Sequence, residues 1–237
     1  MARKPRSLVL FDNCTTHKVW RAHNKEYYLQ NSKIKQLYID SLLKVQKADQ
    51  KDYELNALTL MSNHVHEVIK ISTVKSFSNL MRNHHSNFGL IFNKMHKRCG
   101  KVAQERPHTT CFEVDSYSME AVFYTHANPI KAGMVKDSKM YYWSTHAVYA
   151  FGKKPKWLEG IKFKFPEWYM ELGSTFKERQ AKYRSLFNKY LKKALDGKTY
   201  LRFSKMNFHG GPMWTFTKDQ IIKSYFQNLR ELKNNSS

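Results

Sequence analysis

The chain has 237 residues, enough for one large domain, or for one domain with an appendage, and for a substantial hydrophobic core. Its 41 Lys and Arg residues against 19 Asp and Glu residues give a formal charge of +22, which favours a polyanionic partner, nucleic acid first and an anionic membrane surface second. No apolar run approaches the roughly 18 residues of a membrane-spanning helix, and the three cysteines lack a CxxC spacing, so we expect a cytoplasmic protein without a disulfide framework.

The first part of the chain alternates between strand and helix signals. A basic arm over residues 1–13, with a short edge strand at 7–11, precedes a core strand at 16–22. Asn31 or Ser32 then caps a helix in which apolar residues recur at three- and four-residue spacing. This spacing predicts one buried stripe, made of Ile34, Tyr38, Leu42 and Val45.

A pair of histidines lies in what we expect to be a β-hairpin. Two β-rich runs, residues 53–61 and 64–71, are separated by Ser62 and Asn63, a loop length that suits a hairpin. Side chains alternate between the faces of a strand, so His64 and His66 point the same way. Two neutral imidazoles on one strand provide two ligands of a metal site, although a His-x-His pair alone is equally compatible with a structural role.

The order of the next elements predicts the fold class. A basic helix over residues 74–97 is followed by a strand at 109–114 and a helix at 117–127, which we expect Pro129 to end because the residue before a proline disfavours the α region. The order strand-helix-strand-strand-helix-strand, followed by a helix, is that of an α+β protein with a ferredoxin-like (RRM-like) antiparallel sheet.

The composition changes after Tyr149. Lysines alternate with aromatic residues there, and helices are expected at 175–195 and at 218–233. We therefore divide the chain into a domain over residues 1–150 and a basic, aromatic-rich, mainly helical extension over residues 151–237 that packs on it.

Three polar residues share one face of the helix at 117–127. Tyr124 and Asn128 are four positions apart, and Glu120 lies one turn before Tyr124. Each has an ordinary interpretation: a tyrosine in a helix is commonly a half-buried aromatic, and an asparagine before a proline commonly belongs to a turn. The helix alone therefore does not identify a site.

Three motifs in order, MSNHVHEVI, FYTHANPIKAGMV and YYWSTHAVY, resemble the single-tyrosine HUH transposases, especially the REP-associated tyrosine transposases (RAYTs). Weaker signals fall in family order, among them RKPR near the N-terminus and the HxxxR spacing of His17 and Arg21. The resemblance spans roughly residues 1–150. Ser62 stands where the family usually has proline, and Thr145 replaces a second serine, but neither position has a chemical role.

The resemblance implies an HUH endonuclease fold and a metal-dependent single-stranded DNA endonuclease and strand transferase that cleaves near DNA hairpins. By family position, Tyr124 is the nucleophile that forms a 5′-phosphotyrosine, and His64, His66 and Asn128 bind Mg²⁺ or Mn²⁺. Glu120 is the lesser alternative to Asn128, because a carboxylate is the harder donor. Two alternatives stay open: a non-catalytic protein that binds nucleic-acid hairpins on the same fold, and replication-initiator or relaxase chemistry.

The expected partner is single-stranded or hairpin DNA, with the protein associated with the nucleoid; the sequence does not distinguish a monomer from a homodimer. Trp143 is a candidate for stacking on unpaired bases. The other histidines of the same region, His84, His85, His108 and His126, are expected at the surface or in contact with phosphates. The basic residues predicted to contact DNA are Arg3, Lys4, Arg6, Arg82, Lys94, Lys97, Arg98, Lys101 and Arg106.

Overall fold

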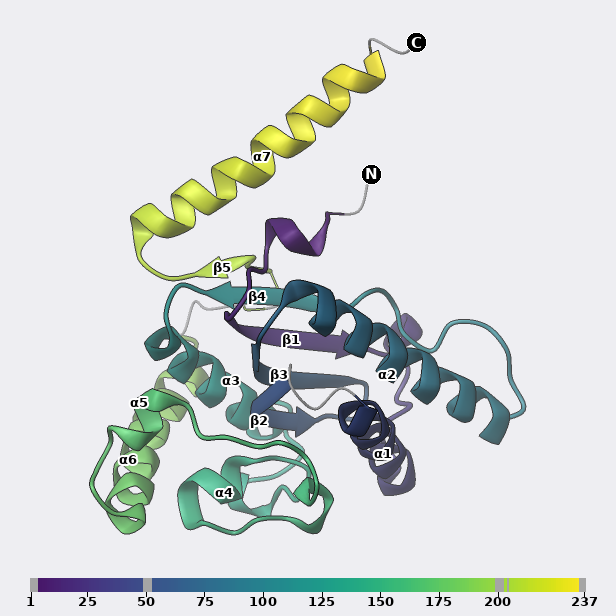
Figure 1. Cartoon of the computed structure of the whole chain (residues 1–237). Helices are drawn as coiled ribbons and strands as arrows, with labels where there is room; N and C mark the ends of the chain where they lie inside the picture. Colours follow the sequence, from purple (N-terminus) through teal and green to yellow (C-terminus); the bar gives the residue numbers. More distant parts are fainter. Residues whose placement is uncertain (1–3, 49–52, 199–202, 204, 235–237) are drawn as a thin grey trace.

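A single β-sheet organises the computed structural model, which describes residues 4–48, 53–198, 203 and 205–234 (Figure 1). Within these residues the sheet has five strands in the order β2-β3-β1-β4-β5. Neighbours among the first four strands are antiparallel, which is the predicted ferredoxin-like order, whereas β5 pairs in parallel with β4 and extends the sheet beyond that prediction. The strands are β1 (Thr15–Arg21), β2 (Tyr53–Leu60), β3 (His64–Ile71), β4 (His108–Phe112) and β5 (Phe208–His209).

Helices cover both faces of the sheet. The helices α1 (Ser32–Ala48) and α2 (Val74–Met95) pack against each other on one face, and α3 (Ser118–Lys131) contacts β1, β2 and β3 from the other (Figure 1). The predicted stripe of α1 is buried from Ile34 to Val45. The order of elements therefore confirms the α+β, ferredoxin-like prediction.

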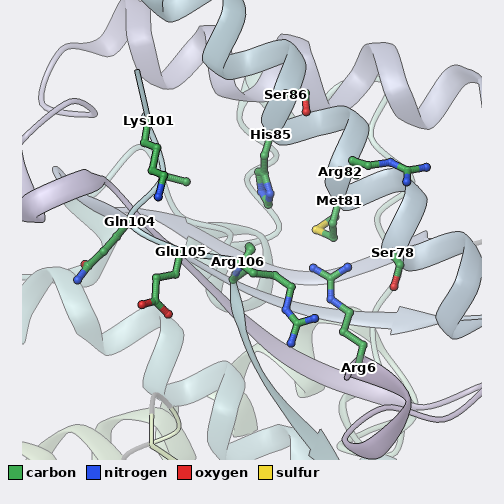
Figure 2. Close-up of a pocket in the computed structure, with 12 residues that line it drawn as sticks. Arg6, Ser78, Met81, Arg82, His85, Ser86, Lys101, Gln104, Glu105 and Arg106 are labelled. Atoms are coloured by element: carbon green, nitrogen blue, oxygen red, sulfur yellow. The ribbon is translucent and has the colours of Figure 1, made fainter. Parts of the chain in front are cut away.

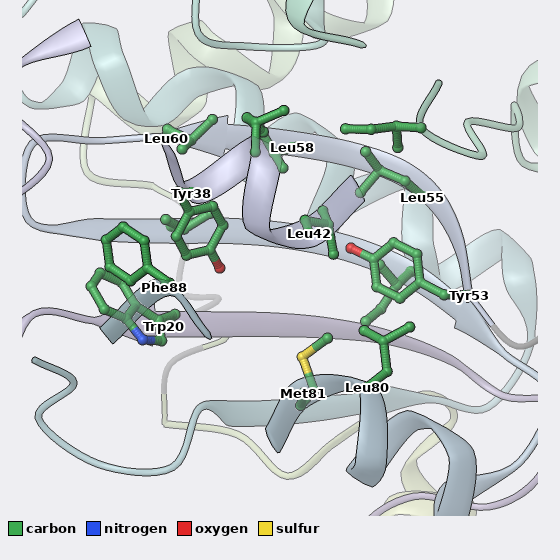
Figure 3. Close-up of a cluster of buried hydrophobic side chains, with 14 of the residues drawn as sticks. Trp20, Tyr38, Leu42, Tyr53, Leu55, Leu58, Leu60, Leu80, Met81 and Phe88 are labelled. Atoms are coloured by element: carbon green, nitrogen blue, oxygen red, sulfur yellow. The ribbon is translucent and has the colours of Figure 1, made fainter. Parts of the chain in front are cut away.

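The face under α1 and α2 holds the main hydrophobic core, in which Trp20, Tyr38 and Phe88 pack together (Figure 3). A charged pair lies inside this core. Lys18 Nζ is 2.7 Å from Glu67 Oε1, and both side chains are fully buried. Glu67 also accepts hydrogen bonds from the hydroxyls of Tyr38 and Tyr53, so its oxygens are satisfied.

We expect Lys18→Met to destabilise the protein by about 3–5 kcal/mol, because it leaves the buried Glu67 carboxylate without its cation. Chemical denaturation followed by circular dichroism measures this free energy of unfolding. Lys162→Met is the matched control, since Lys162 pairs with Glu54 at the surface and should cost no more than about 1 kcal/mol. Equal losses of unfolding free energy in the two variants would show that the buried pair contributes no more to stability than the surface pair.

Three predictions of secondary structure need correction. Residues 6–8 form a 3₁₀ turn instead of an edge strand, with the Arg6 guanidinium over the Phe77 ring. Pro129 does not end α3, which continues to Lys131 and stops where Gly133 adopts a φ of 67° that suits glycine. The last helix, α7 (Pro212–Asn234), begins before the predicted residue 218, because a proline fits the first helical position.

The residues after 150 pack on the sheet and on α3. The helix α4 (His146–Phe151) and the helix α6 (Phe176–Leu195) contact each other, and α6 also contacts α3. Thr175 and Glu178 form a capping box at the start of α6. The short helix α5 (Glu167–Met170) lies beside them, while α7 extends away from the sheet (Figure 1). The domain boundary at residue 150 stays a prediction.

Two of the histidines expected at the surface lie in the interior. His84 is fully buried and its Nε2 is 3.0 Å from the carbonyl oxygen of Tyr38. His126 is also fully buried, between the hydroxyls of Tyr183 and Thr145. Both rings therefore serve packing and hydrogen bonding in the fold. In the part of the chain that the structure describes, no helix has the length and apolar character needed to cross a membrane.

Candidate active site

Strands β1 and β3 bring three histidines together on the face that α3 covers. The register pairs His66 with Val19 and His64 with Arg21, so these four side chains share a face with His17, two residues before Val19. His17 and His66 stack at a centroid distance of 5.2 Å, and the His64 and His66 rings meet edge to face at 4.8 Å. The shared direction predicted for His64 and His66 is thus present, and His17 joins them.

All three imidazoles are held in the neutral form. Burial lowers the pKa of His17 to about 3, with smaller contributions from His108 and His64. Burial, followed by the charge of Arg21, lowers the pKa of His64 to about 4. Burial lowers the pKa of His66 well below its ordinary value as well. A neutral imidazole is the form that can donate a ring nitrogen lone pair to a metal ion.

The hydrogen bonds of the histidines leave specific nitrogens available. The Asn63 amide nitrogen donates to the Lys25 carbonyl, so the Asn63 oxygen faces His64 and accepts from its Nδ1 at 2.6 Å. His64 therefore keeps its lone pair on Nε2. His66 Nδ1 lies 3.0 Å from His17 Nε2, and His66 Nε2 is buried without a hydrogen-bond partner among the described residues.

The tyrosine helix lies directly over these rings. The half-buried Tyr124 ring meets His66 edge to face at 5.3 Å and His17 at 5.7 Å. Lys131 Nζ lies 5.6 Å from the centre of the same ring. One turn after Tyr124, the amide nitrogen of Asn128 donates to the Tyr124 carbonyl at 2.8 Å, so the amide oxygen is the end that can bind a cation.

The carboxylate of Glu120 has a partner in the C-terminal extension. Its Oε2 lies 3.2 Å from His209 Nε2, in β5. Among the described residues no group of three or more His, Cys, Asp or Glu side chains can hold a metal ion, so Glu120 does not complete such a group with His64 and His66.

Phe203, from the C-terminal extension, also reaches the site. Its fully buried ring lies 5.4 Å from the His17 ring and 5.3 Å from the Tyr124 ring. Its carbonyl oxygen accepts a hydrogen bond from the Thr110 hydroxyl at 2.6 Å. No motif in the extension predicts this contact. The high aromatic content of the extension indicated only that the extension packs against the first domain.

The predicted DNA contacts fall into groups. Arg98 packs over the rings of Tyr28 at 4.9 Å and Phe92 at 5.7 Å near the end of α2, where Lys94 and Lys97 are exposed. The Lys4 ammonium donates to the Asn207 side chain, and Arg3 lies outside the described residues. The remaining four predicted contacts line one pocket; they are Arg6, Arg82, Lys101 and Arg106.

Trp143, expected to stack on bases, belongs to the core and is only 9% exposed. Its ring stacks on Trp157 at 6.2 Å, and Lys35 Nζ lies 5.9 Å from its centre. The ring faces are therefore covered by protein. This burial corrects the expected role in base stacking, which requires an accessible face.

Comparison with known proteins gives a family match and a fold match. Residues 10–122 match the family described as IS200-like transposases, a range that includes both strand histidines and ends shortly before Tyr124. The solved structure of a REP-associated tyrosine transposase bound to a REP hairpin is 21% identical, with a TM-score of 0.53 over 70% of this chain and 95% of that chain. The tRNA(His) guanylyltransferase of Saccharomyces cerevisiae is 13% identical, with a TM-score of 0.37 over 77% of this chain and 80% of its own. No curated protein matches.

Proposed function

We propose that this chain, whose residues 10–122 match the family described as IS200-like transposases, is a metal-dependent endonuclease and strand transferase for single-stranded DNA. The observation that carries the proposal is the packing of the Tyr124 ring against His66, whose Nε2 has no partner among the described residues. The related transposase was solved with a REP hairpin, which supports hairpin DNA as the substrate class.

The residues present fit a divalent cation. His64 and His66 would each offer Nε2, and the Asn128 amide oxygen would be the third protein ligand. These three ligands are neutral, so they leave the positive charge of the ion for the scissile phosphate. Bound Mg²⁺ or Mn²⁺ would supply Lewis-acid polarisation of that phosphate.

Tyr124 would supply the nucleophile. Its hydroxyl oxygen forms a bond to phosphorus, the bond from phosphorus to the 3′-oxygen breaks, and the leaving oxygen takes up a proton as the phenol loses one. The product is a 5′-phosphotyrosine and a free 3′-OH. Because the new ester conserves the energy of the old one, a 3′-OH can attack it in return, and strands are joined without ATP.

A nicking assay tests the proposed function. A labelled hairpin with a single-stranded flank should be cleaved in the presence of Mg²⁺ or Mn²⁺ and remain intact with EDTA, and a blunt duplex of equal length should resist cleavage. Binding should weaken by about 10³-fold between 50 and 200 mM salt if about six phosphates are contacted. Equal binding of hairpin and duplex, without cleavage of either, would favour a non-catalytic nucleic-acid-binding protein.

His17 should control how His66 binds the ion, because a ligating histidine needs an acceptor for its other ring N–H. We expect His17→Phe to weaken Mn²⁺ affinity by about 10- to 100-fold, as measured by electron paramagnetic resonance. His17→Gln, whose amide oxygen can accept in place of His17 Nε2, should retain most of the affinity. Hairpin binding without metal serves as the control and should not change. Equal affinities in both variants would show that the hydrogen bond is not required.

A further inference from the structure

A basic pocket lies on the far side of β1 from α3, between α2, the N-terminal turn and the segment that leads into β4 (Figure 2). Its volume is about 500 Å³. Figure 2 shows the guanidinium groups of Arg6 and Arg106 beside each other at its centre. Arg82 and Lys101 add two further cations, while Glu105 is the one carboxylate among the described lining residues.

Arg6 is partly buried, and its guanidinium lies over the Phe77 ring without a carboxylate partner among the described residues. Burial, followed by the charge of the neighbouring Arg106, lowers the pKa of Arg6 to about 10. Its Nε is buried and has no hydrogen-bond partner among the described residues. Arg106 donates to the Lys4 carbonyl oxygen, and an anionic acceptor that both neighbouring guanidinium groups can share would stabilise them. A phosphate matches this need, because two of its oxygens can accept from the fork of an arginine.

His85 provides an independent observation that points to a ligand. Its ring extends from α2 into the pocket, and its Nε2 is buried without a hydrogen-bond partner in the described part of the chain (Figure 2). A neutral imidazole can donate an N–H to an anionic oxygen. The pocket therefore presents donors from three separate segments: the N-terminal turn, α2 and the segment at 101–107.

A second pocket extends from the first toward the strand β1. This second pocket, of about 320 Å³, shares the segment from Gln104 to Pro107 with the first, so Arg106 lines both. Val19 and Arg21 also line the second pocket. These residues pair with His66 and His64 in the register of β1 and β3, so the second pocket opens on the face that holds the histidines. The shared segment thus lies between the first pocket and that face.

We propose that the first pocket binds a backbone phosphate of the DNA strand that continues past Arg106 and Arg21 to the histidines. This inference rests on the proposed function and adds a fixed anchor point to it. A phosphate held by Arg6 and Arg106 sets the distance, in nucleotides, between the anchored position and the cleaved one. A contact to a backbone phosphate fixes the position of the strand and carries no base-sequence information.

Binding of modified DNA tests the anchor. Fluorescence anisotropy measures the affinity of Tyr124→Phe protein, without metal, for a hairpin whose flank carries one methylphosphonate at a time. We expect one position, or two adjacent ones, at which loss of the phosphate charge weakens binding about tenfold. In protein that also carries Arg6→Gln, the same modification should change affinity less than about twofold, since the interaction is already lost.

A charge-matched control separates the pocket from general electrostatics. Lys192→Gln removes one exposed positive charge on α6, so it should weaken all modified substrates alike and preserve the position-specific loss. If Arg6→Gln behaves like Lys192→Gln at every position, the anchor does not exist. Arg106→Gln provides a second variant if Arg6→Gln fails to fold, as judged by circular dichroism.

Thermal unfolding in the presence of inorganic phosphate tests whether the pocket binds a free anion instead of DNA. Stabilisation by inorganic phosphate that disappears in Arg6→Gln, without any position-specific loss in the binding assay, would assign the pocket to a small phosphate and overturn the DNA anchor. A different result would count against the proposed function and leave the anchor in place. In that case the metal-loaded wild type does not cleave the hairpin, but one methylphosphonate position still weakens binding.

Discussion

Tyr124→Phe should fold and bind hairpin DNA as the wild type does, yet form no covalent product. The substitution removes one oxygen and keeps the ring that packs edge to face against His17 and His66 and beside Phe203. Removing the nucleophile should lower strand cleavage below detection, because water is not held in the position of the phenol. Thermal unfolding and hairpin affinity report on folding and binding, and denaturing gel electrophoresis of a 3′-end-labelled hairpin reports on the adduct.

Other tyrosines serve as controls for this assignment. Tyr117→Phe is the matched variant, since Tyr117 precedes the same helix and its ring lies against His209 instead of the strand histidines. The covalent protein–DNA adduct should form in Tyr117→Phe as it does in the wild type. Tyr141 is buried, with its hydroxyl donating to the Leu60 carbonyl, and it is poorly placed to attack. An adduct that persists in Tyr124→Phe, or that maps to Tyr117 or Tyr141, would overturn the assignment, and cleavage without any adduct would identify water as the nucleophile.

Part of the core could be predicted from sequence because some of its elements have a clear period. The stripe of α1 and the alternation that puts His64 and His66 on one face are local properties, readable from spacing alone. The end of α3 could not be predicted from such spacing. The proline rule acts on the residue before Pro129, but packing against the sheet and α6 holds that residue helical until Gly133 ends the helix.

The contacts of the candidate site that cross long sequence distances could not be predicted. The hydrogen bond between His17 and His66 depends on the register of β1 against β3, and no sequence motif predicts that register. Phe203 and His209 reach the site because β5 adds to the edge of β4, and a two-residue strand has almost no sequence signal. Trp143 illustrates the opposite error: composition suggested an exposed ring, while tertiary packing buried it.

The third ligand of the proposed metal site is testable by comparing two residues on α3. Glu120 Oε2 lies 3.2 Å from His209 Nε2, whereas the Asn128 amide donates to the helix backbone and leaves its oxygen for a cation. Asn128→Ala should therefore weaken Mn²⁺ binding, though less than loss of a histidine, because water can replace one oxygen ligand. Glu120→Ala should leave Mn²⁺ binding unchanged. A larger loss in Glu120→Ala would mean that the carboxylate, and not the amide, is the ligand.

Substituting His64 or His66 by alanine should abolish nicking and leave hairpin affinity within a few-fold of the wild type. Each substitution removes an Nε2 that the proposed ion needs, but neither touches the basic residues of α2 and of the pocket beside Arg6, which are the proposed electrostatic contacts to DNA. Isothermal titration with Mn²⁺ should show no saturable site in either variant, and anisotropy should show near-normal hairpin binding. His96→Ala is the control: His96 is exposed just after α2, so its loss should change neither metal binding nor nicking. Hairpin affinity that falls together with metal affinity would mean that the ion carries much of the binding, whereas nicking that survives in His66→Ala would remove this histidine from the site.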